Sequence, residues 1–77
     1  MTDPRELENA FYEGRRDPEE LPFVVNDAVE LQYGLDAGMR GTVIAAFLED
    51  ECLIYTVELS NGKDIQVPPT EIALIEP

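Results

Sequence analysis

The sequence predicts a mainly β protein: a small five-stranded barrel that follows a short N-terminal helical extension. Short apolar or alternating segments follow one another between residues 28 and 75, a pattern typical of a small barrel. Asn61-Gly62, between two of them, is the strongest short signal for a β-hairpin. The apolar residues before position 22 instead have helical spacing. We therefore expect an N-terminal helix and connector over 1–22 and the barrel over 23–77.

Residues 3–6, Asp-Pro-Arg-Glu, predict the start of a helix, because a capping acid, a proline at the first helical position and a glutamate three residues after the cap form a capping box. Leu7, Ala10 and Phe11 then fall at i, i+3 and i+4 and form a narrow apolar stripe. Gly14 predicts the C-terminal stop. A helix of about ten residues is marginal alone and needs a surface to pack against.

A polar connector, residues 15–22, separates this helix from the barrel. Within it, residues 17–20 (Asp-Pro-Glu-Glu) predict one helical turn, which Pro22 would end.

After Pro22 the apolar pattern changes from helical to alternating or continuous. Strands are expected over Ala28–Tyr33, Gly41–Phe47, Cys52–Leu59, Asp64–Val67 and Ile72–Ile75. Residues 68–71, which include two prolines, predict a turn or one turn of 3₁₀ helix between the last two strands.

The second expected strand is apolar on both faces. Alternation places Val43, Ala45 and Phe47 on one face and Ile44 and Ala46 on the other. Because the outer face of a barrel strand should be polar, something is expected to cover Ile44 and Ala46. The chain's own N-terminal helix is the nearest candidate, and a second subunit or a partner is the alternative.

The segment Gly38-x-x-Gly41-Thr42-Val43, with the strands around it, resembles the SH3-like barrel and specifically the small bacterial domains with a KOW-type Gly-x-x-Gly-Thr-Val start to the second strand. The resemblance covers residues 26–76 and implies a fold, since this barrel serves many unrelated functions. The glycines are interpreted as structural, because Gly34 and Gly38 bracket a loop and Gly41 permits close backbone approach. A phosphate-binding loop would instead need a following helix or lysine.

Charge is the extreme feature of the chain: 17 acidic and five basic residues give a net charge of −12, and there is no histidine. Such a field repels nucleic-acid phosphates and anionic membranes, so neither is expected as a direct partner. Nucleic-acid-binding KOW-type domains would carry basic loops. Here the loop 34–40 has one acid and one base, and the expected hairpin tip is Glu49-Asp50-Glu51. The charge therefore indicates either solubility alone or a locally basic protein partner.

The composition argues against catalysis, and no cofactor is expected. Nucleophilic catalysis lacks a histidine base, and a Cys/His metal site would need more than Cys52. The three carboxylates at 49–51 are interpreted as a solvated turn and not as a metal site, because adjacent side chains in a turn rarely converge. A single cysteine and an apolar run, residues 43–48, too short to cross a bilayer lead us to expect a cytoplasmic protein.

Two interpretations of the aromatic residues remain open. They lie partly exposed near the loops, where they contact a partner, or they fill the core of a small barrel. The candidate partner-binding residues are Tyr12, Phe23, Tyr33, Tyr55, Ile44, Glu49, Asp50 and Glu51.

From the sequence we expect a non-catalytic accessory or adaptor domain that binds a larger, locally basic protein. The alternative is an acidic inhibitor that mimics nucleic acid, or an antitoxin-like partner of a basic protein. A homodimer through the Ile44/Ala46 face or through the N-terminal helix is a further expectation. Carboxylates in rows along one face would favour mimicry, whereas an apolar anchor would favour the adaptor.

Overall fold

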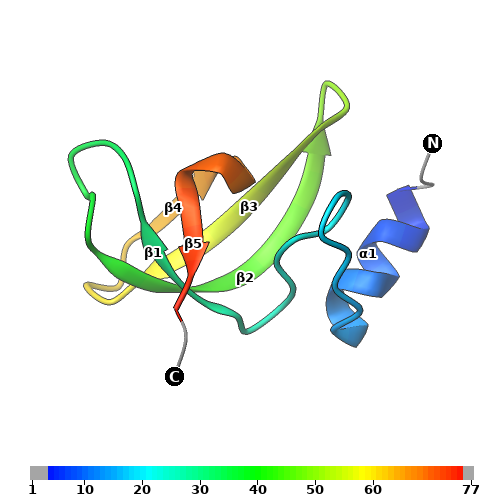
Figure 1. The fold of residues 1–77 in the computed structure, drawn as a ribbon, viewed down its shortest axis with the longest axis horizontal. Coiled ribbons are helices and arrows are strands. Elements are labelled where there is room, and N and C mark those ends of the chain that lie inside the picture. The colour runs from blue at the N-terminus through cyan, green and yellow to red at the C-terminus, as the bar shows by residue number, and fades with distance from the viewer. Residues whose placement is uncertain (1–3, 76–77) are drawn as a thin grey trace.

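The computed structural model describes residues 4–75 and contains one five-stranded antiparallel sheet and one α-helix (Figure 1). The elements are α1 (Pro4–Glu13), β1 (Ala28–Leu31), β2 (Arg40–Glu49), β3 (Cys52–Leu59), β4 (Asp64–Val67), the 3₁₀ turn η1 (Pro69–Glu71) and β5 (Ile72–Leu74). The strand order in the sheet is β4-β3-β2-β1-β5. The expected mainly β class with an N-terminal helix is confirmed.

The strand β2 lies at the centre of the sheet. It pairs with β1 through residues 40–42 and with β3 through residues 41–49. Gly41 is required here, because a Cβ at this position would lie 2.7 Å from the carbonyl oxygen of Glu58 and 2.7 Å from Val57 Cγ1. Gly38, which precedes the strand, has φ +90°, a conformation that favours glycine. Both glycines are therefore structural, as expected.

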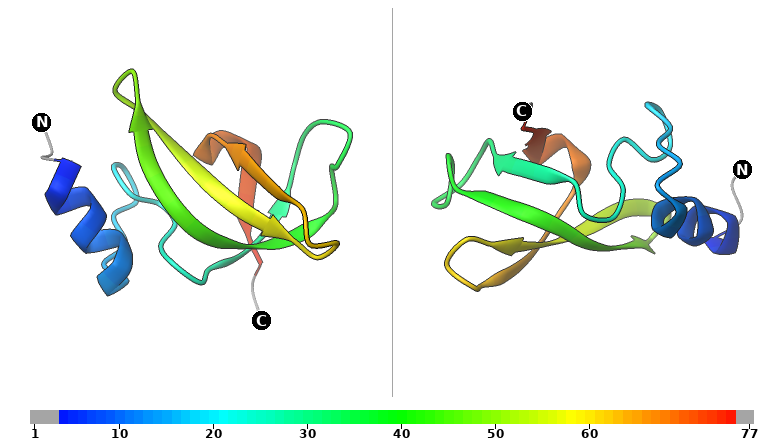
Figure 2. Two further views of the ribbon diagram at one scale, coloured as in Figure 1. Left: turned by 180° about the vertical axis from the view of Figure 1, so that it is seen from behind. Right: turned by 90° about the horizontal axis from the view of Figure 1, so that it is seen from below.

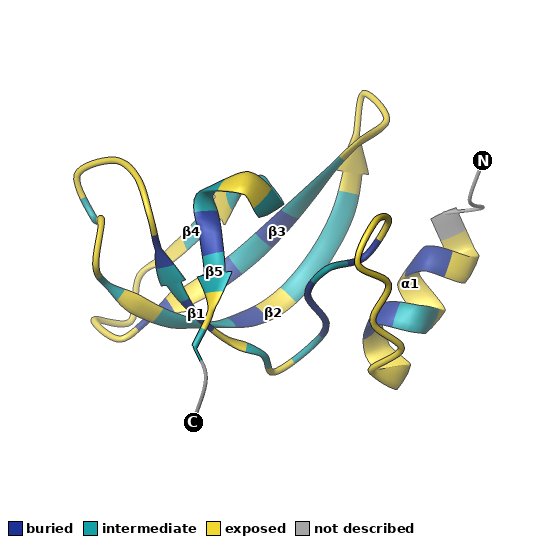
Figure 3. Ribbon diagram, viewed as in Figure 1, coloured by how far each residue is buried: buried dark blue, intermediate teal, exposed yellow. Residues whose placement is uncertain are grey.

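The hydrophobic core joins the sheet to the N-terminal segment (Figure 3). Its buried residues are Leu7, Phe11, Leu21, Phe23, Val24, Val29, Leu31, Val43, Tyr55, Val57, Leu59 and Ile72. The first three come from α1 and the connector and the next two from the segment between the connector and β1, so the residues before the sheet supply part of the same apolar cluster as the strands. The helix thereby gains the packing surface that its short length requires.

The helix ends as the sequence predicts. Gly14 has φ +74°, and its N–H donates to the carbonyl of Phe11 while the N–H of Arg15 donates to that of Ala10. This pair of bonds is a Schellman cap. The predicted N-terminal cap, Asp3, lies outside the described residues.

The connector contains a single closed turn at residues 17–21. Asp17 and Leu21 exchange two backbone hydrogen bonds of 2.9 and 2.8 Å, which close residues 17–21 into a tight loop. The Asp17 carboxylate accepts bonds from the N–H groups of Glu19 and Glu20 and so satisfies the turn. The bond from the Leu21 N–H to the Asp17 carbonyl links residues four apart, as in an α-helix, so the single helical turn predicted at residues 17–20 forms. The reverse bond, from the Asp17 N–H to the Leu21 carbonyl, closes this turn into a loop, and no helix continues from it.

The first strand is shorter than expected. β1 ends at Leu31, and the next N–H, that of Gln32, donates to the carbonyl of Glu71. The chain then enters the β1–β2 loop, where Tyr33 is 67% exposed. The strand expected over Ala28–Tyr33 therefore extends two residues past the true end of β1. Within residues 4–75, no helix is long and apolar enough to cross a membrane.

Candidate protein-interaction surface

Two of the four candidate aromatic residues belong to the core. Tyr55 is fully buried and Phe23 is nearly so, with their rings in edge-to-face contact at 5.6 Å. The Tyr55 hydroxyl donates to the Phe23 carbonyl at 2.7 Å and accepts from the Phe23 N–H at 3.0 Å. Burial raises the pKa of Tyr55 to about 12, so the hydroxyl stays protonated and keeps donating. These residues fasten the segment after the connector to the sheet and do not form a contact surface.

The other two aromatic residues are exposed, but at opposite ends of the molecule. Tyr12 lies on α1 and Tyr33 in the β1–β2 loop, and the views in Figures 1 and 2 place these elements far apart. Of the two interpretations of the aromatic residues, core packing applies to Phe23 and Tyr55, and exposure near a loop or helix surface applies to Tyr12 and Tyr33. One contact surface including all four does not exist.

A β-bulge changes the faces of β2. The register shifts between Val43 and Ala45, so that Val43 lies opposite Val57 and Ala46 lies opposite Tyr55. Directly opposed residues share a face, and both partners are buried, so Ala46 points toward the core. The expectation that Ala46 lies on the outer face is wrong, because the bulge adds one residue to the alternation.

The helix α1 covers part of β2, as the sequence analysis expected. The strand β1 pairs only with the first residues of β2, up to Thr42. Beyond residue 43 this edge of β2 has no strand partner, and α1 packs beside it. Leu7 and Ala46 line the same groove, whereas Ile44, at the bulge, remains 36% exposed. The N-terminal helix therefore covers Ala46 but leaves Ile44 exposed.

The β2–β3 turn presents three exposed carboxylates. Glu49 and Cys52 form the last strand pair, which leaves Asp50 and Glu51 as a two-residue turn with φ values of 50° and 66°. Turns with positive φ at both positions favour Asn-Gly or Asp-Gly. A glutamate at the second position costs about 1 kcal/mol relative to glycine.

The helix α1, the connector loop and the β2–β3 turn lie at the same end of the molecule (Figures 1 and 2). Apart from Glu13, which pairs with Arg15, and Asp17, which caps the connector turn, these elements carry seven exposed acidic residues. We call this surface the acidic end. Its residues are Glu6, Glu8, Glu19, Glu20, Glu49, Asp50 and Glu51. The carboxylates are thus more concentrated than their spread along the sequence suggests.

An apolar groove of about 270 Å³ opens at the acidic end, between α1 and the second half of β2. We call it the α1–β2 groove. It is lined by Leu7, Glu8, Ala46, Phe47 and Leu48. Leu48 is 39% exposed, and Tyr12, one helical turn after Glu8, shares the face of α1 that borders the groove. Sequence reasoning missed Leu48, because it falls beyond the predicted end of the strand.

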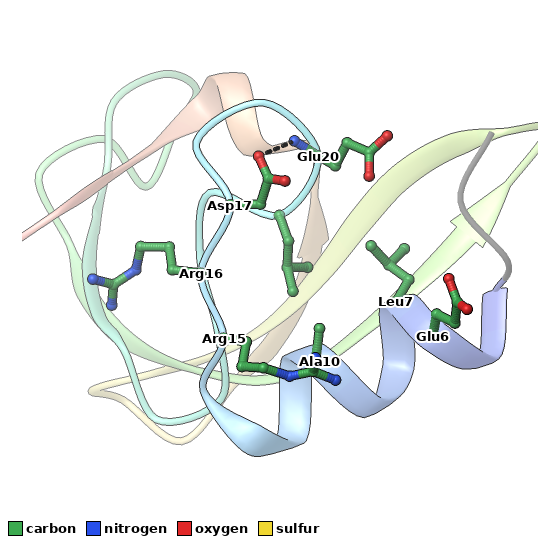
Figure 4. A pocket seen from close by; sticks show the side chains of 8 residues that line it. Glu6, Leu7, Ala10, Arg15, Arg16, Asp17 and Glu20 are labelled. Carbon is green, nitrogen blue, oxygen red and sulfur yellow. Dashed lines mark hydrogen bonds between the residues drawn. The ribbon is translucent and has the colours of Figure 1, made fainter.

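A second recess, of about 510 Å³, lies between α1 and the connector (Figure 4). It is lined by Glu6, Leu7, Ala10, Arg15, Arg16, Asp17, Glu20 and Leu21. Figure 4 shows the Glu6 and Glu20 side chains on either side of Leu7, while Arg16 extends away from them. This recess mixes both signs of charge, in contrast to the α1–β2 groove.

Arginines elsewhere in the chain pair with its own acids. Arg15 contacts Glu13 at 2.6 Å, and Arg16 contacts Asp27 at 2.7 Å. Arg40 lies 3.9 Å from Glu30. None of these three pairs involves a carboxylate of the acidic end, where Arg5 on the first turn of α1 is an exposed basic residue.

The described residues provide no metal site, since residues 4–75 contain no group of three or more His, Cys, Asp or Glu side chains that could hold a metal ion. Cys52 is exposed at the start of β3.

Comparisons of the chain with protein-family models, curated proteins and solved structures found no match.

Proposed function

We propose that the protein is a non-catalytic interaction domain, an accessory or adaptor, that binds a larger, locally basic protein through its acidic end. One observation carries the proposal: the end of the molecule that carries seven exposed acidic residues also holds an apolar groove, which Glu8 lines and Glu49 borders in sequence. Carboxylates alone are typical of a solvated surface, but charge beside exposed apolar area is typical of a contact surface.

The electrostatics support a basic partner. The net charge of −12 raises the association rate with a positively charged surface, and the acidic end directs the approach. The same field opposes association with nucleic acid and with an anionic membrane. It also opposes face-to-face pairing of two acidic ends, so a homodimer through this surface is disfavoured.

For the fold we infer an SH3-like barrel of the kind that the Gly-x-x-Gly-Thr-Val segment resembles. Three features support the inference: the strand order, the bulge that lets β2 bend between its two neighbours, and the single 3₁₀ turn between β4 and β5. This fold supplies a rigid platform and does not itself specify a ligand.

The proposal is tested by capture from a lysate of the source cell, with washes in a salt series and identification by mass spectrometry. The bait is compared with the triple variant Glu49→Gln, Asp50→Asn, Glu51→Gln. We expect a basic protein that the wild type retains at moderate salt and the variant loses.

A matched control separates local charge from net charge. The triple variant Asp36→Asn, Glu58→Gln, Asp64→Asn also removes three negative charges, all outside the acidic end. It should capture the partner as the wild type does. Equal loss in both variants would contradict a defined surface, and capture of a nucleic-acid-binding protein that moderate salt fully releases would favour the mimic.

A further inference from the structure

The α1–β2 groove includes apolar surface that the core does not use. Leu7 and Ala46 belong to the core or pack against it, but Leu48 is 39% exposed at the end of β2. The strand has no strand partner on this side beyond residue 43, so its last residues border the groove directly. Water covers this apolar surface in the free protein, and a ligand side chain that replaced the water would gain hydrophobic free energy.

The size of the groove indicates one side chain. Its volume of about 270 Å³ is slightly below the range of pockets for drug-sized molecules. It suits a single large apolar residue of a peptide or protein segment, the kind of anchor that dominates many protein interfaces.

The charges around the groove specify what must flank that anchor. Glu8 lines the groove, Glu49 directly follows Leu48, and the exposed carboxylates of Asp50 and Glu51 come next in the turn. The lining contains no lysine or arginine, in contrast to the recess between α1 and the connector. A bound segment therefore meets negative charge on the α1 side and on the β2–β3 side.

We propose that the α1–β2 groove binds one large apolar side chain of a partner segment whose flanking residues are lysines or arginines. This inference rests on the proposed function and names the partner chemistry at that surface. An acidic apolar segment, including one from a second copy of this chain, is excluded by the same charges.

The test is selection of peptides from a random 16-residue library displayed on phage, with the full-length protein as the target. The selected peptides should contain a Leu, Ile, Met, Phe or Trp with lysines or arginines on both sides. A synthetic peptide of the selected sequence should bind the Leu48→Ala variant about tenfold more weakly than the wild type, because the variant loses part of the apolar wall.

The matched control is Leu35→Ala, the same substitution at a fully exposed leucine in the β1–β2 loop at the opposite end of the molecule. It should leave the affinity unchanged. Thermal unfolding of both variants verifies that they fold. In a ¹H–¹⁵N titration of the wild type, the amides of Ala46, Phe47 and Leu48 should shift.

The remaining outcomes separate the two proposals. Basic peptides without an apolar residue, insensitive to Leu48→Ala, would overturn the groove inference and leave the basic-partner proposal intact. A selection without basic peptides would overturn both. An equal loss of affinity with Leu48→Ala and Leu35→Ala would also overturn the groove inference, since the groove would then have no special role.

Discussion

The two halves of β2 are held in different ways. The first half, residues 40–43, lies between β1 and β3, with Val43 fully buried and Gly41 pressed against the backbone of Glu58. The second half, residues 45–49, pairs with β3 on one side only and has α1 on the other. One strand thus changes from the centre of a sheet to the border of a groove.

The difference teaches how a small domain combines stability with a contact surface. Backbone pairing on both sides fixes the first half, so its side chains serve the core. Side-chain packing from a short helix covers the second half only in part, so apolar area and carboxylates stay accessible there. On this account α1 is a structural part of the domain as well as one wall of the groove.

The largest effect on stability is expected from a substitution that removes the packing of α1 against the sheet. Phe11→Ala removes a buried ring that packs near Tyr55 at 6.2 Å, and it should destabilise the protein by about 4 kcal/mol. Chemical denaturation measures the change. Tyr12→Ala, which removes an exposed ring in edge-to-face contact with Phe11 at 5.0 Å, should cost only about 1 kcal/mol. A small effect of Phe11→Ala would mean that α1 is an appendage and not part of the core.

A smaller effect is expected from the first half of β2. Gly41→Ala places a Cβ 2.7 Å from a backbone oxygen that cannot easily move, and the expected cost is about 2–3 kcal/mol. Gly34→Ala is the comparison that separates backbone strain from close contact. Gly34 has φ +89°, but no atom lies within 4 Å of the added Cβ. This substitution should cost about 1 kcal/mol. Equal costs would show that close approach at Gly41 is unimportant.

The next effect is expected from loss of the hydrogen bonds between Tyr55 of β3 and Phe23, which follows the connector. Tyr55→Phe leaves the buried N–H and C=O of Phe23 without the hydroxyl, which should cost about 2 kcal/mol at neutral pH.

The same bond has a pH signature. The folded-state pKa of Tyr55, about 12, lies above the ordinary value of 10.0, so folding favours the protonated form. Its contribution is complete below about pH 10 and is lost as the pH rises through about 12. The stability difference between wild type and Tyr55→Phe, measured by urea unfolding, should therefore narrow in this interval. A difference that stays constant up to pH 12 would contradict the buried hydroxyl.

The smallest expected effect is a gain. Glu51→Gly relieves the positive φ in the β2–β3 turn and should stabilise the protein by about 1 kcal/mol. Asp50→Gly should gain less, because aspartate tolerates this conformation better than glutamate. If Glu51 contributes to partner binding, the more stable Glu51→Gly variant binds the partner more weakly. A gain in both stability and affinity would exclude a role for this carboxylate.

Much of the fold could be predicted from the sequence, because local signals define most elements. Gly14 ends α1, Asn61-Gly62 forms the β3–β4 turn, and the paired prolines of residues 68–71 separate β4 from β5. β3 and β4 have the predicted bounds. Each signal acts through the conformation of one or two residues and does not depend on the rest of the chain.

The contact surface was less predictable, because it depends on contacts between distant residues. The bulge after Val43 comes from pairing with β3, and it reverses the face that alternation assigns to Ala46. The burial of Phe23 depends on Tyr55, 32 residues later. The carboxylates at 49–51 were predicted as a group, but their proximity to α1 emerges only from the fold.

Site-specific photo-crosslinking in the source cell tests the central claim, binding through the acidic end, most directly. A benzophenone amino acid replaces Leu48 in one version of the protein and Leu35 in the other, so that exposed positions at opposite ends are compared. The account predicts a crosslink to a basic protein from position 48 and none to that protein from position 35. A crosslink to the partner from position 35 alone would place the contact at the β1–β2 loop and contradict the account.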